Sequence, residues 1–170
     1  AGYAFVGWYK DEACTKAFSF GGELSANVTL YAKWDAVRVN YMVLYWQENA
    51  DDDGYSLKES EVRQGLTGAL TEASASKNYK GFSASTKKLV VQQTIAGDGS
   101  TVVHVYYDRN IYTVKFMRNG RAIEELTITA KYGANISDQW PSRRKDLDNT
   151  YPSSWRISKN GDKYQSGIAT

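Results

Sequence analysis

The clearest strand pattern in the chain lies between Asn27 and Trp34, where apolar and polar side chains alternate. The apolar positions are Val28, Leu30, Ala32 and Trp34, and the positions between them are Thr29, Tyr31 and Lys33. Successive side chains of a strand point to opposite faces of the sheet, so a period of two predicts a strand with one buried face.

A second apolar run, from Val39 to Trp46, follows after the short connector Asp35 to Arg38. Its sequence, VNYMVLYW, has apolar residues at both odd- and even-numbered positions, as in a strand that is covered on both faces. We therefore expect a central strand here. The charged stretch QENADDDG at 47–54 indicates the loop that ends it.

The middle of the chain predicts a small sheet crossed by one helix. A strand is expected from Tyr55, with a break at Gly65 and Gly68, because glycine is the residue best suited to turns. The segment 71–79, TEASASKNY, is predicted to be a short helix capped by Thr71. Extended segments at 80–85 and 87–96, a turn at 97–100 and a strand at 101–107 complete an α+β, β-rich arrangement.

One pattern recurs along the chain. Tyr41-x-Val43-x-Tyr45 is repeated as Tyr112-x-Val114-x-Phe116 at an offset of 71 residues, in both cases shortly after a strand and an aspartate. Self-similarity at a fixed spacing is typical of tandem modules. It predicts boundaries near Ala36 and Asn110, and hence modules at 1–35, 36–110 and 111–170. The two outer modules look incomplete.

The composition supports a β-rich protein. The chain has 13 Tyr, 5 Trp and 5 Phe among its 170 residues, and aromatic side chains pack well on pleated surfaces. The N-terminal stretch YAFVGWYKDEACTKAF places its rings, at Tyr3, Phe5, Trp8, Tyr9 and Phe18, around a polar turn. This arrangement indicates a core-forming turn of a small sheet domain rather than a catalytic loop.

Charge and cysteine content exclude several classes of partner and structure. A formal net charge of +2 gives no electrostatic footprint for nucleic acid or an acidic membrane, and the short basic run Arg143, Arg144 and Lys145 reads as a solvated loop. No apolar run is long enough to cross a membrane, and the first residues show no signal-peptide pattern. Cys14 is the only cysteine, so no internal disulfide is possible.

The sequence predicts a non-enzymatic protein without catalytic residues, bound metal or cofactor. His104 is the only histidine, and its neighbours in the predicted strand are apolar, which favours a core or edge position over a base. With one Cys and one His there is no nucleophile–base pair, and no nucleotide-binding or hydrolase motif is found.

Two further groups of residues were weighed as ligand sites. Asp51, Asp52, Asp53 and Gly54 carry oxygen ligands that suit calcium, but the spacing is not that of an EF-hand and a solvated hairpin loop explains it better. The rings of Trp46, Trp140 and Trp155 could stack on sugars, although each also suits the core anchor of its own module.

Residues 2–34, with the segments GWY, FSF and TLYAKW, resemble the C-terminal half of the internalin B-type (Listeria-Bacteroides) repeat, and the usual Asp of the middle segment is Ser19 here. The middle block, with VNYMVLYW, GLTG, YKGF and GSTVVHVYYDRN, resembles the MucBP-type (mucin-binding protein) repeat. The segments YTVKFMRNG and ITAKYGANISDQWP are similar to the N-terminal half of a related repeat.

These resemblances imply an elongated array of β-grasp, ubiquitin-like modules in a cell-wall-anchored surface protein of Gram-positive bacteria. In such a module Gly7 would allow close approach and Trp8 would fill the space between sheet and helix. The expected function is a stalk that spaces or presents a binding region. The alternative is a module that itself binds mucin-type glycans or a host surface protein, as fold alone does not fix function.

Overall fold

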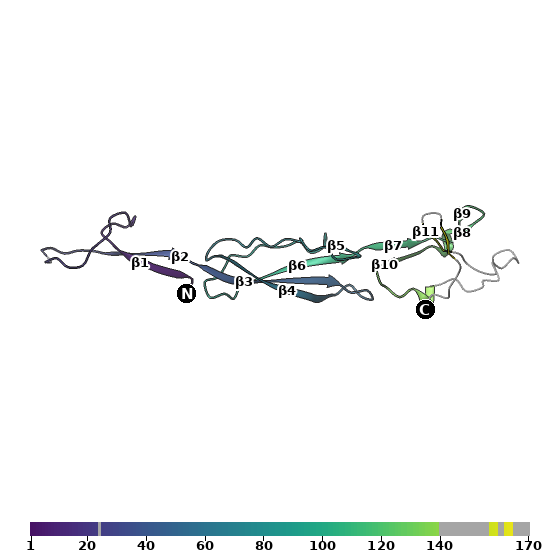
Figure 1. Cartoon of the computed structure of the whole chain (residues 1–170), viewed down its shortest axis with the longest axis horizontal. Coiled ribbons are helices and arrows are strands. Elements are labelled where there is room, and N and C mark those ends of the chain that lie inside the picture. Colours follow the sequence, from purple (N-terminus) through teal and green to yellow (C-terminus); the bar gives the residue numbers. More distant parts are fainter. Residues whose placement is uncertain (24, 140–156, 160–161, 165–170) are drawn as a thin grey trace. The chain divides into compact units, whose positions relative to one another are not determined.

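The computed structural model describes residues 1–23, 25–139, 157–159 and 162–164, and it shows a β-rich chain (Figure 1). Two compact units are present, residues 1–109 and residues 110–170. The predicted modules 1–35 and 36–110 therefore lie within one unit, apart from Asn110. The basic run 143–145, Trp140 and Trp155 lie outside the described residues.

The first unit begins with a hairpin. Strand β1 (Tyr3–Tyr9) pairs antiparallel with β2 (Tyr31–Ala36), and a bulge lies between Phe5 and Gly7. Asp11 caps the turn after β1, because its carboxylate accepts hydrogen bonds from the backbone N–H groups of Thr15 and Lys16 and from the Thr15 hydroxyl. The hydrogen bond to the Thr15 side chain is the main reason that the pKa of Asp11 is lowered.

The rest of the unit is a four-stranded mixed sheet in the order β4-β3-β6-β5 (Figure 1). Its strands are β3 (Arg38–Glu48), β4 (Tyr55–Leu66), β5 (Phe82–Ala84) and β6 (Val102–Arg109). The β3–β4 and β5–β6 pairs are antiparallel and the central β3–β6 pair is parallel. The expected central strand at 39–46 is thus confirmed as part of β3.

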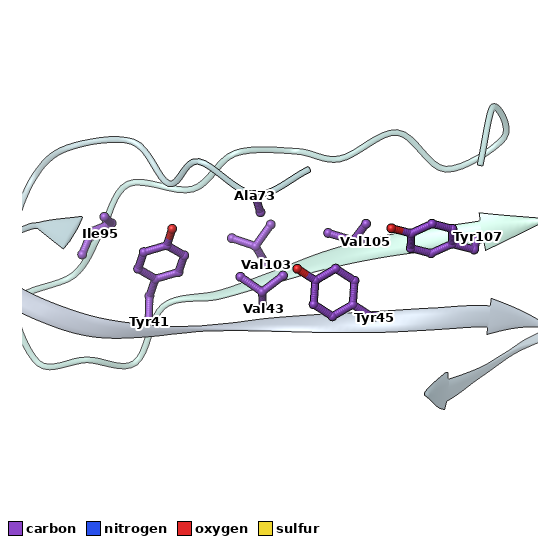
Figure 2. Packing of buried hydrophobic residues seen from close by; sticks show 8 residues of the cluster. All are labelled: Tyr41, Val43, Tyr45, Ala73, Ile95, Val103, Val105 and Tyr107. Atoms are coloured by element: carbon purple, nitrogen blue, oxygen red, sulfur yellow. The ribbon is translucent and has the colours of Figure 1, made fainter. Parts of the chain in front are cut away.

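One face of this sheet carries the core, which Figure 2 shows. Tyr41, Val43 and Tyr45 of β3 lie beside Val103, Val105 and Tyr107 of β6, and all six are buried. Ala73 and Ile95, from the chain between β4 and β6, cover them. Alternate residues of both strands therefore supply the core, in keeping with the two-residue period of a strand.

The predicted helix at 71–79 is wrong, because these residues are extended. Their burial alternates, with Thr71 and Ala73 buried and Glu72 and Ser74 exposed, so the small residues follow a period of two. The backbone is also held by partners outside the segment: Thr71 N–H donates to the Gln93 carbonyl and Lys77 N–H to the Tyr107 hydroxyl. In a helix capped by Thr71, the Lys77 N–H would instead donate to the Ala73 carbonyl.

Two other expectations needed correction. β4 does not break at Gly65, where a Cβ would come within 2.3 Å of the Ile95 side chain, so this glycine makes room for core packing. The face of residues 28–34 is not buried: Val28 is 48% exposed and Trp34 is 56% exposed, because the two-stranded hairpin has no third strand or covering segment over it among the described residues.

The second unit contains a hairpin of β7 (Ile111–Val114) and β10 (Ile128–Lys131). Between them lie β8 (Met117–Arg118), β9 (Arg121–Ala122) and the 3-10 helix η1 (Glu124–Leu126), and η2 (Ser137–Gln139) follows. Phe116, Leu126 and Ile128 form its buried core. The strands β11 (Ile157–Lys159) and β12 (Asp162–Tyr164) pair with each other.

The hairpins of the chain are structural repeats of one another. In β1–β2, Tyr3 pairs with Ala36 and Phe5 with Trp34, and in β5–β6 the equivalent pairs are Phe82 with Arg109 and Ala84 with Tyr107. Gly2 and Gly81, which precede the two hairpins' first strands, have φ values of 82° and 81°. Only glycine adopts such values readily, so the same backbone conformation precedes the first strand of both hairpins.

The β3–β4 and β7–β10 hairpins correspond in the same way. Arg38 pairs with Leu66, and Ile111 pairs with Lys131. The backbone hydrogen bonds that follow are equivalent: Thr67 N–H to Val37 and Ala69 N–H to Leu66 in the first, Tyr132 N–H to Asn110 and Ala134 N–H to Lys131 in the second. Gly68 and Gly133, at φ 83° and 74°, occupy the same place in the turn.

Candidate functional site

The second face of the middle sheet exposes apolar side chains among the residues that the structure describes. Met42, Leu57, Val62 and Val102 are 40%, 51%, 61% and 38% exposed. Strand pairing places these residues together, because Met42 lies opposite both Val62 and Val102, and Leu57 lies opposite Trp46. We call this surface the open face.

Three rings form a strip on the open face, which we call the aromatic strip: Trp46 of β3 and His104 and Tyr106 of β6. Trp46 lies opposite Tyr106 in the parallel pair. The ring centroids are 5.8 Å apart for Trp46 and His104, and 6.2 Å for Trp46 and Tyr106 and for His104 and Tyr106, and the planes differ by 17–29°. The rings are thus nearly parallel over two strands.

Polar groups flank the aromatic strip on one side. Tyr55 meets Tyr106 edge to face at 5.1 Å, and the Lys88 ammonium lies 4.4 Å from the Tyr55 ring centroid and 4.8 Å from that of Tyr106. The Tyr55 hydroxyl donates a hydrogen bond of 2.5 Å to Asp108. A cation over aromatic faces is held by the ring quadrupole, so Lys88 is directed onto the strip.

The His104 ring is held by its contacts within the aromatic strip. Its Nδ1 accepts a hydrogen bond of 2.9 Å from the Trp46 indole N–H, so the neutral ring carries its proton on Nε2. The prediction that His104 lies in the core or at an edge is wrong in detail, since its side chain is exposed on a central strand. An indole N–H cannot orient a base, because only an acceptor can hold the imidazole N–H.

In the acidic loop between β3 and β4, the Asp52 carboxylate accepts hydrogen bonds from within the loop. Asp52 accepts hydrogen bonds from the Asn49 side chain at 2.8 Å and from Gly54 N–H at 2.6 Å, and Asn49 in turn accepts from the Ser56 hydroxyl at 2.7 Å. In the part of the chain that the structure describes, no group of three or more His, Cys, Asp or Glu side chains could hold a metal ion. The loop joins β3 to β4 as a polar hairpin turn.

A charged network lies at the border of the core face and was not anticipated. Glu61 receives hydrogen bonds from Arg63 at 2.8 Å, the Lys77 ammonium at 3.1 Å and the Tyr45 hydroxyl at 3.2 Å. The hydrogen bond from Arg63, followed by that from Lys77, lowers the pKa of Glu61 from 4.5 to about 2. Burial and a hydrogen bond to Glu59 raise the pKa of Tyr79. Lys77 and Tyr79 belong to the extended segment that crosses the sheet, so these contacts fasten it to β4.

Glu48, at the end of β3, is buried although the sequence placed it in a solvated loop. Its carboxylate accepts a hydrogen bond of 2.8 Å from Arg109 N–H and forms an ion pair of 3.0 Å with Lys87, whose pKa it raises. A buried carboxylate is stable only with such partners. Glu48 joins β3 to the end of β6, and no sequence signal marked it, because its partners lie 39 and 61 positions away.

Comparison with known families adds one match. Residues 1–33 match the Listeria-Bacteroides repeat domain. We call residues 1–33, which contain β1 and the first half of β2, the Listeria-Bacteroides repeat segment. Two proteins of Evansella cellulosilytica are similar over 85% of the chain: "Putative membrane protein", 27% identical, and "Putative Gly-rich membrane protein", 26% identical.

The chain spans only 21% and 16% of the lengths of these two curated relatives. No solved structure matches it significantly. Within the described part of the chain, no helix combines the length and the apolar character needed to cross a bilayer.

The Listeria-Bacteroides repeat segment differs in packing from what the resemblance implied. Trp8 is 39% exposed, and it contacts Phe5 edge to face at 5.6 Å without lying between a sheet and a helix. A Cβ on Gly7 would meet nothing closer than 3.9 Å, so this residue does not allow a close approach and instead lies at the bulge of β1. Phe5 also contacts Trp34 at 5.2 Å. The segment is a hairpin with a small aromatic cluster that water reaches.

Proposed function

We propose that this chain is a non-enzymatic segment of an extracellular bacterial surface protein, in which it spaces or presents a binding region away from a Gram-positive cell wall. The observation that carries the proposal is the recurrence of equivalent hairpins with equivalent glycine turns along the chain. Repeated units that each carry a small core suit a spacer, because length is added without a new fold. The match of residues 1–33 to the Listeria-Bacteroides repeat and the names of the two relatives support a place in a surface-associated repeat protein.

We further propose that residues 36–110 are a MucBP-like β-grasp module, part of an elongated tandem array. Two central parallel strands, each flanked by an antiparallel neighbour, support the β-grasp assignment. In a β-grasp module a helix crosses the sheet. Here the non-helical segment 71–79 takes that place, and Lys77 and Tyr79 fix it to β4. The strand order is therefore that of a β-grasp module, but a different element covers the sheet.

The spacer function is tested by displaying the chain on a bacterial surface between an anchor and an epitope. The displayed proteins would carry zero, one or two copies of residues 1–170, and a globular domain of similar length would serve as control. We expect the height of the epitope above the wall, measured by fluorescence localisation, to rise with each copy and more than with the control. An equal height for one copy and the globular control would reject the proposal.

The aromatic strip favours a second function, direct binding of mucin-type glycans. Near-parallel rings at Trp46, His104 and Tyr106, flanked by Lys88, offer apolar edges and polar groups to a sugar. The test is a mucin-glycan array with the whole chain, the variant Trp46→Ala and the control Leu57→Ala from the same face. Binding lost only in Trp46→Ala supports this function. No binding by the natural chain at high micromolar concentration rejects it and leaves the spacer proposal in place.

A further inference from the structure

The chain enters and leaves the middle sheet on two neighbouring strands. It enters from β2 at the start of β3, near Arg38, and it leaves towards β7 at the end of β6, near Arg109. These two strands take the central places of the sheet and pair with each other in parallel. Because they are parallel, the start of β3 and the end of β6 lie at opposite ends of the pair. Figure 2 shows both strands running in the same direction, with their core side chains on one face.

A pull on the chain from both sides of the sheet therefore acts on β3 and β6 in opposite directions along their axes. The paired residues are 42–47 of β3 and 102–107 of β6. Met42 N–H donates to the Thr101 carbonyl at 2.9 Å, and the hydrogen bonds of a parallel pair are evenly spaced along the strands. Such a pull loads these bonds in shear and at the same time. A pull that separated the two strands from one end would instead break them one after another.

The core side chains resist the same displacement. Alternate residues of both strands face the core, so sliding one strand by one residue would turn buried side chains to the open face. A slide of two residues would move Tyr45 away from Tyr107, whose ring centroid lies 6.5 Å from its own. Val43 and Val105 are fully buried beside these rings, and a close-packed interior has no room for a partial slide.

Side-chain bonds join the two strands at the end where the chain leaves the sheet. Arg109 N–H donates to the Glu48 carboxylate at 2.8 Å, and Arg109 Nε donates to the Glu48 carbonyl oxygen at 2.7 Å. Glu48 is 2% exposed and also forms an ion pair of 3.0 Å with Lys87. Hydrogen bonds that involve a charged group are stronger than those between neutral groups. We call these contacts the Glu48 clasp, and they lie where a pull from the side of β7 first acts.

We propose that the parallel β3–β6 pair, closed by the Glu48 clasp, is a mechanical clamp that keeps the middle sheet folded when the chain is pulled from both sides. This load-bearing function rests on the proposed spacer function, because a spacer between a wall anchor and an attached partner transmits the force between them. Forced unfolding is governed by the unfolding rate and not by the free energy of unfolding. The resistance of the clamp therefore depends on the direction of the pull.

Optical tweezers would pull the whole chain in two directions through pairs of introduced cysteines at exposed positions. Both variants carry Cys14→Ser, so that handles attach only at the chosen sites. Asp35→Cys with Ile111→Cys pulls the start of β3 against the end of β6. Asp51→Cys with Ile111→Cys pulls on the end of β3 and the end of β6, which lie at the same end of the pair. Urea denaturation of both variants without handles checks that they fold with the same stability.

At equal loading rate, we expect the middle sheet to unfold at several-fold higher force in the first variant than in the second. The reason is that the first pull shears the pair and the second opens it from one end. Equal forces in the two directions, or a higher force in the second, would overturn the proposal.

Two glutamate variants, each made in the first cysteine variant, test the Glu48 clasp. Glu48→Gln removes the charge of the clasp and should lower the unfolding force. The matched control Glu61→Gln also removes a paired carboxylate, but one on β4 outside the β3–β6 pair, and should lower the force less. An equal or larger loss of force in Glu61→Gln would overturn the part assigned to the clasp. No surface display enters these measurements, so their failure leaves the spacer function untouched, and a failed display test leaves the measured forces valid.

Discussion

Trp34 and Tyr107 allow a direct comparison, because they occupy the same place in two equivalent hairpins. Replacing Tyr107 by Ala removes a ring that is 1% exposed, and such truncations cost about 3–5 kcal/mol of unfolding free energy. It also removes the acceptor of the Lys77 N–H, at 2.8 Å, which adds about 1 kcal/mol. Trp34 is 56% exposed, so its truncation returns about half as much area to water and should cost about 1–2 kcal/mol.

The assay is urea denaturation followed by circular dichroism at submicromolar concentration, where copies of the chain are separate. We expect Tyr107→Ala to lower the unfolding free energy by about 2–5 kcal/mol more than Trp34→Ala does. Tyr107→Phe keeps the ring and controls for the hydroxyl, at a cost of about 1 kcal/mol. Equal losses for the two alanine variants would refute the reasoning, because they would show that Trp34 is covered in the single chain.

Three further predictions follow from contacts in the first unit. At pH 7, Glu61→Gln should lower the unfolding free energy by about 1 kcal/mol, discounted because the carboxylate is partly exposed. The pKa of Glu61 is about 2 in the folded chain and 4.5 in the unfolded chain, so the carboxylate stabilises the fold above pH 4.5 and this contribution is lost as the pH falls through about 2. If urea titrations gave the same difference in unfolding free energy between the natural chain and Glu61→Gln at every pH, this prediction would be contradicted. Gly97→Ala should lower the unfolding free energy by about 1–3 kcal/mol, because its Cβ would lie 2.4 Å from the Ala1 carbonyl oxygen and 2.7 Å from Gly2 Cα. The control Gly22→Ala, whose Cβ would meet no atom within 4 Å, should leave the melting temperature nearly unchanged. Trp46→Phe should release the His104 ring, and a ¹⁵N NMR spectrum in which the His104 Nδ1 shift stays unchanged would show that the bond is not made.

The central position of β3 in the middle sheet was predictable from the sequence, because local pattern and burial agree there. The run from Val39 to Trp46 is apolar on both faces, and β3 does lie between two strands. The turn at 97–100 also forms, with Gly99 N–H bonded to the Ala96 carbonyl. In both cases the residues that decide the structure are neighbours in the sequence.

The prediction of a helix at 71–79 was wrong because the structure of this segment depends on partners that are distant in the sequence. Alternation of small residues at Thr71, Ala73 and Ala75 was a local sign of an extended chain, but Thr71 as a cap outweighed it. What holds the segment is Tyr107, Gln92 and Glu61, from other strands and loops. Likewise, the strand expected from Asn27 to Trp34 forms only from Tyr31, and the side chains of Val28 and Trp34 on its apolar face are exposed.

The candidate site was only partly visible in the sequence. Trp46 was considered as a sugar platform, but its partners His104 and Tyr106 are 58 and 60 positions away, and only the parallel pairing of β3 with β6 brings the three rings together. The buried Glu48 had no local signal at all, because QEN before three aspartates has the composition of a loop. Strand pairing between distant parts of the sequence places both the aromatic strip and Glu48, and the hydrophobic periodicity of the sequence does not encode that pairing.

The central claim is that the chain is an extended tandem array that acts as a spacer. Small-angle X-ray scattering coupled to size-exclusion chromatography tests it most directly, because the column separates single chains before they are measured. One compact domain of 170 residues would have a radius of gyration of about 15 Å. The account predicts roughly 20 Å or more for modules joined end to end. A value near the compact one would contradict it, because the modules would then share a single core.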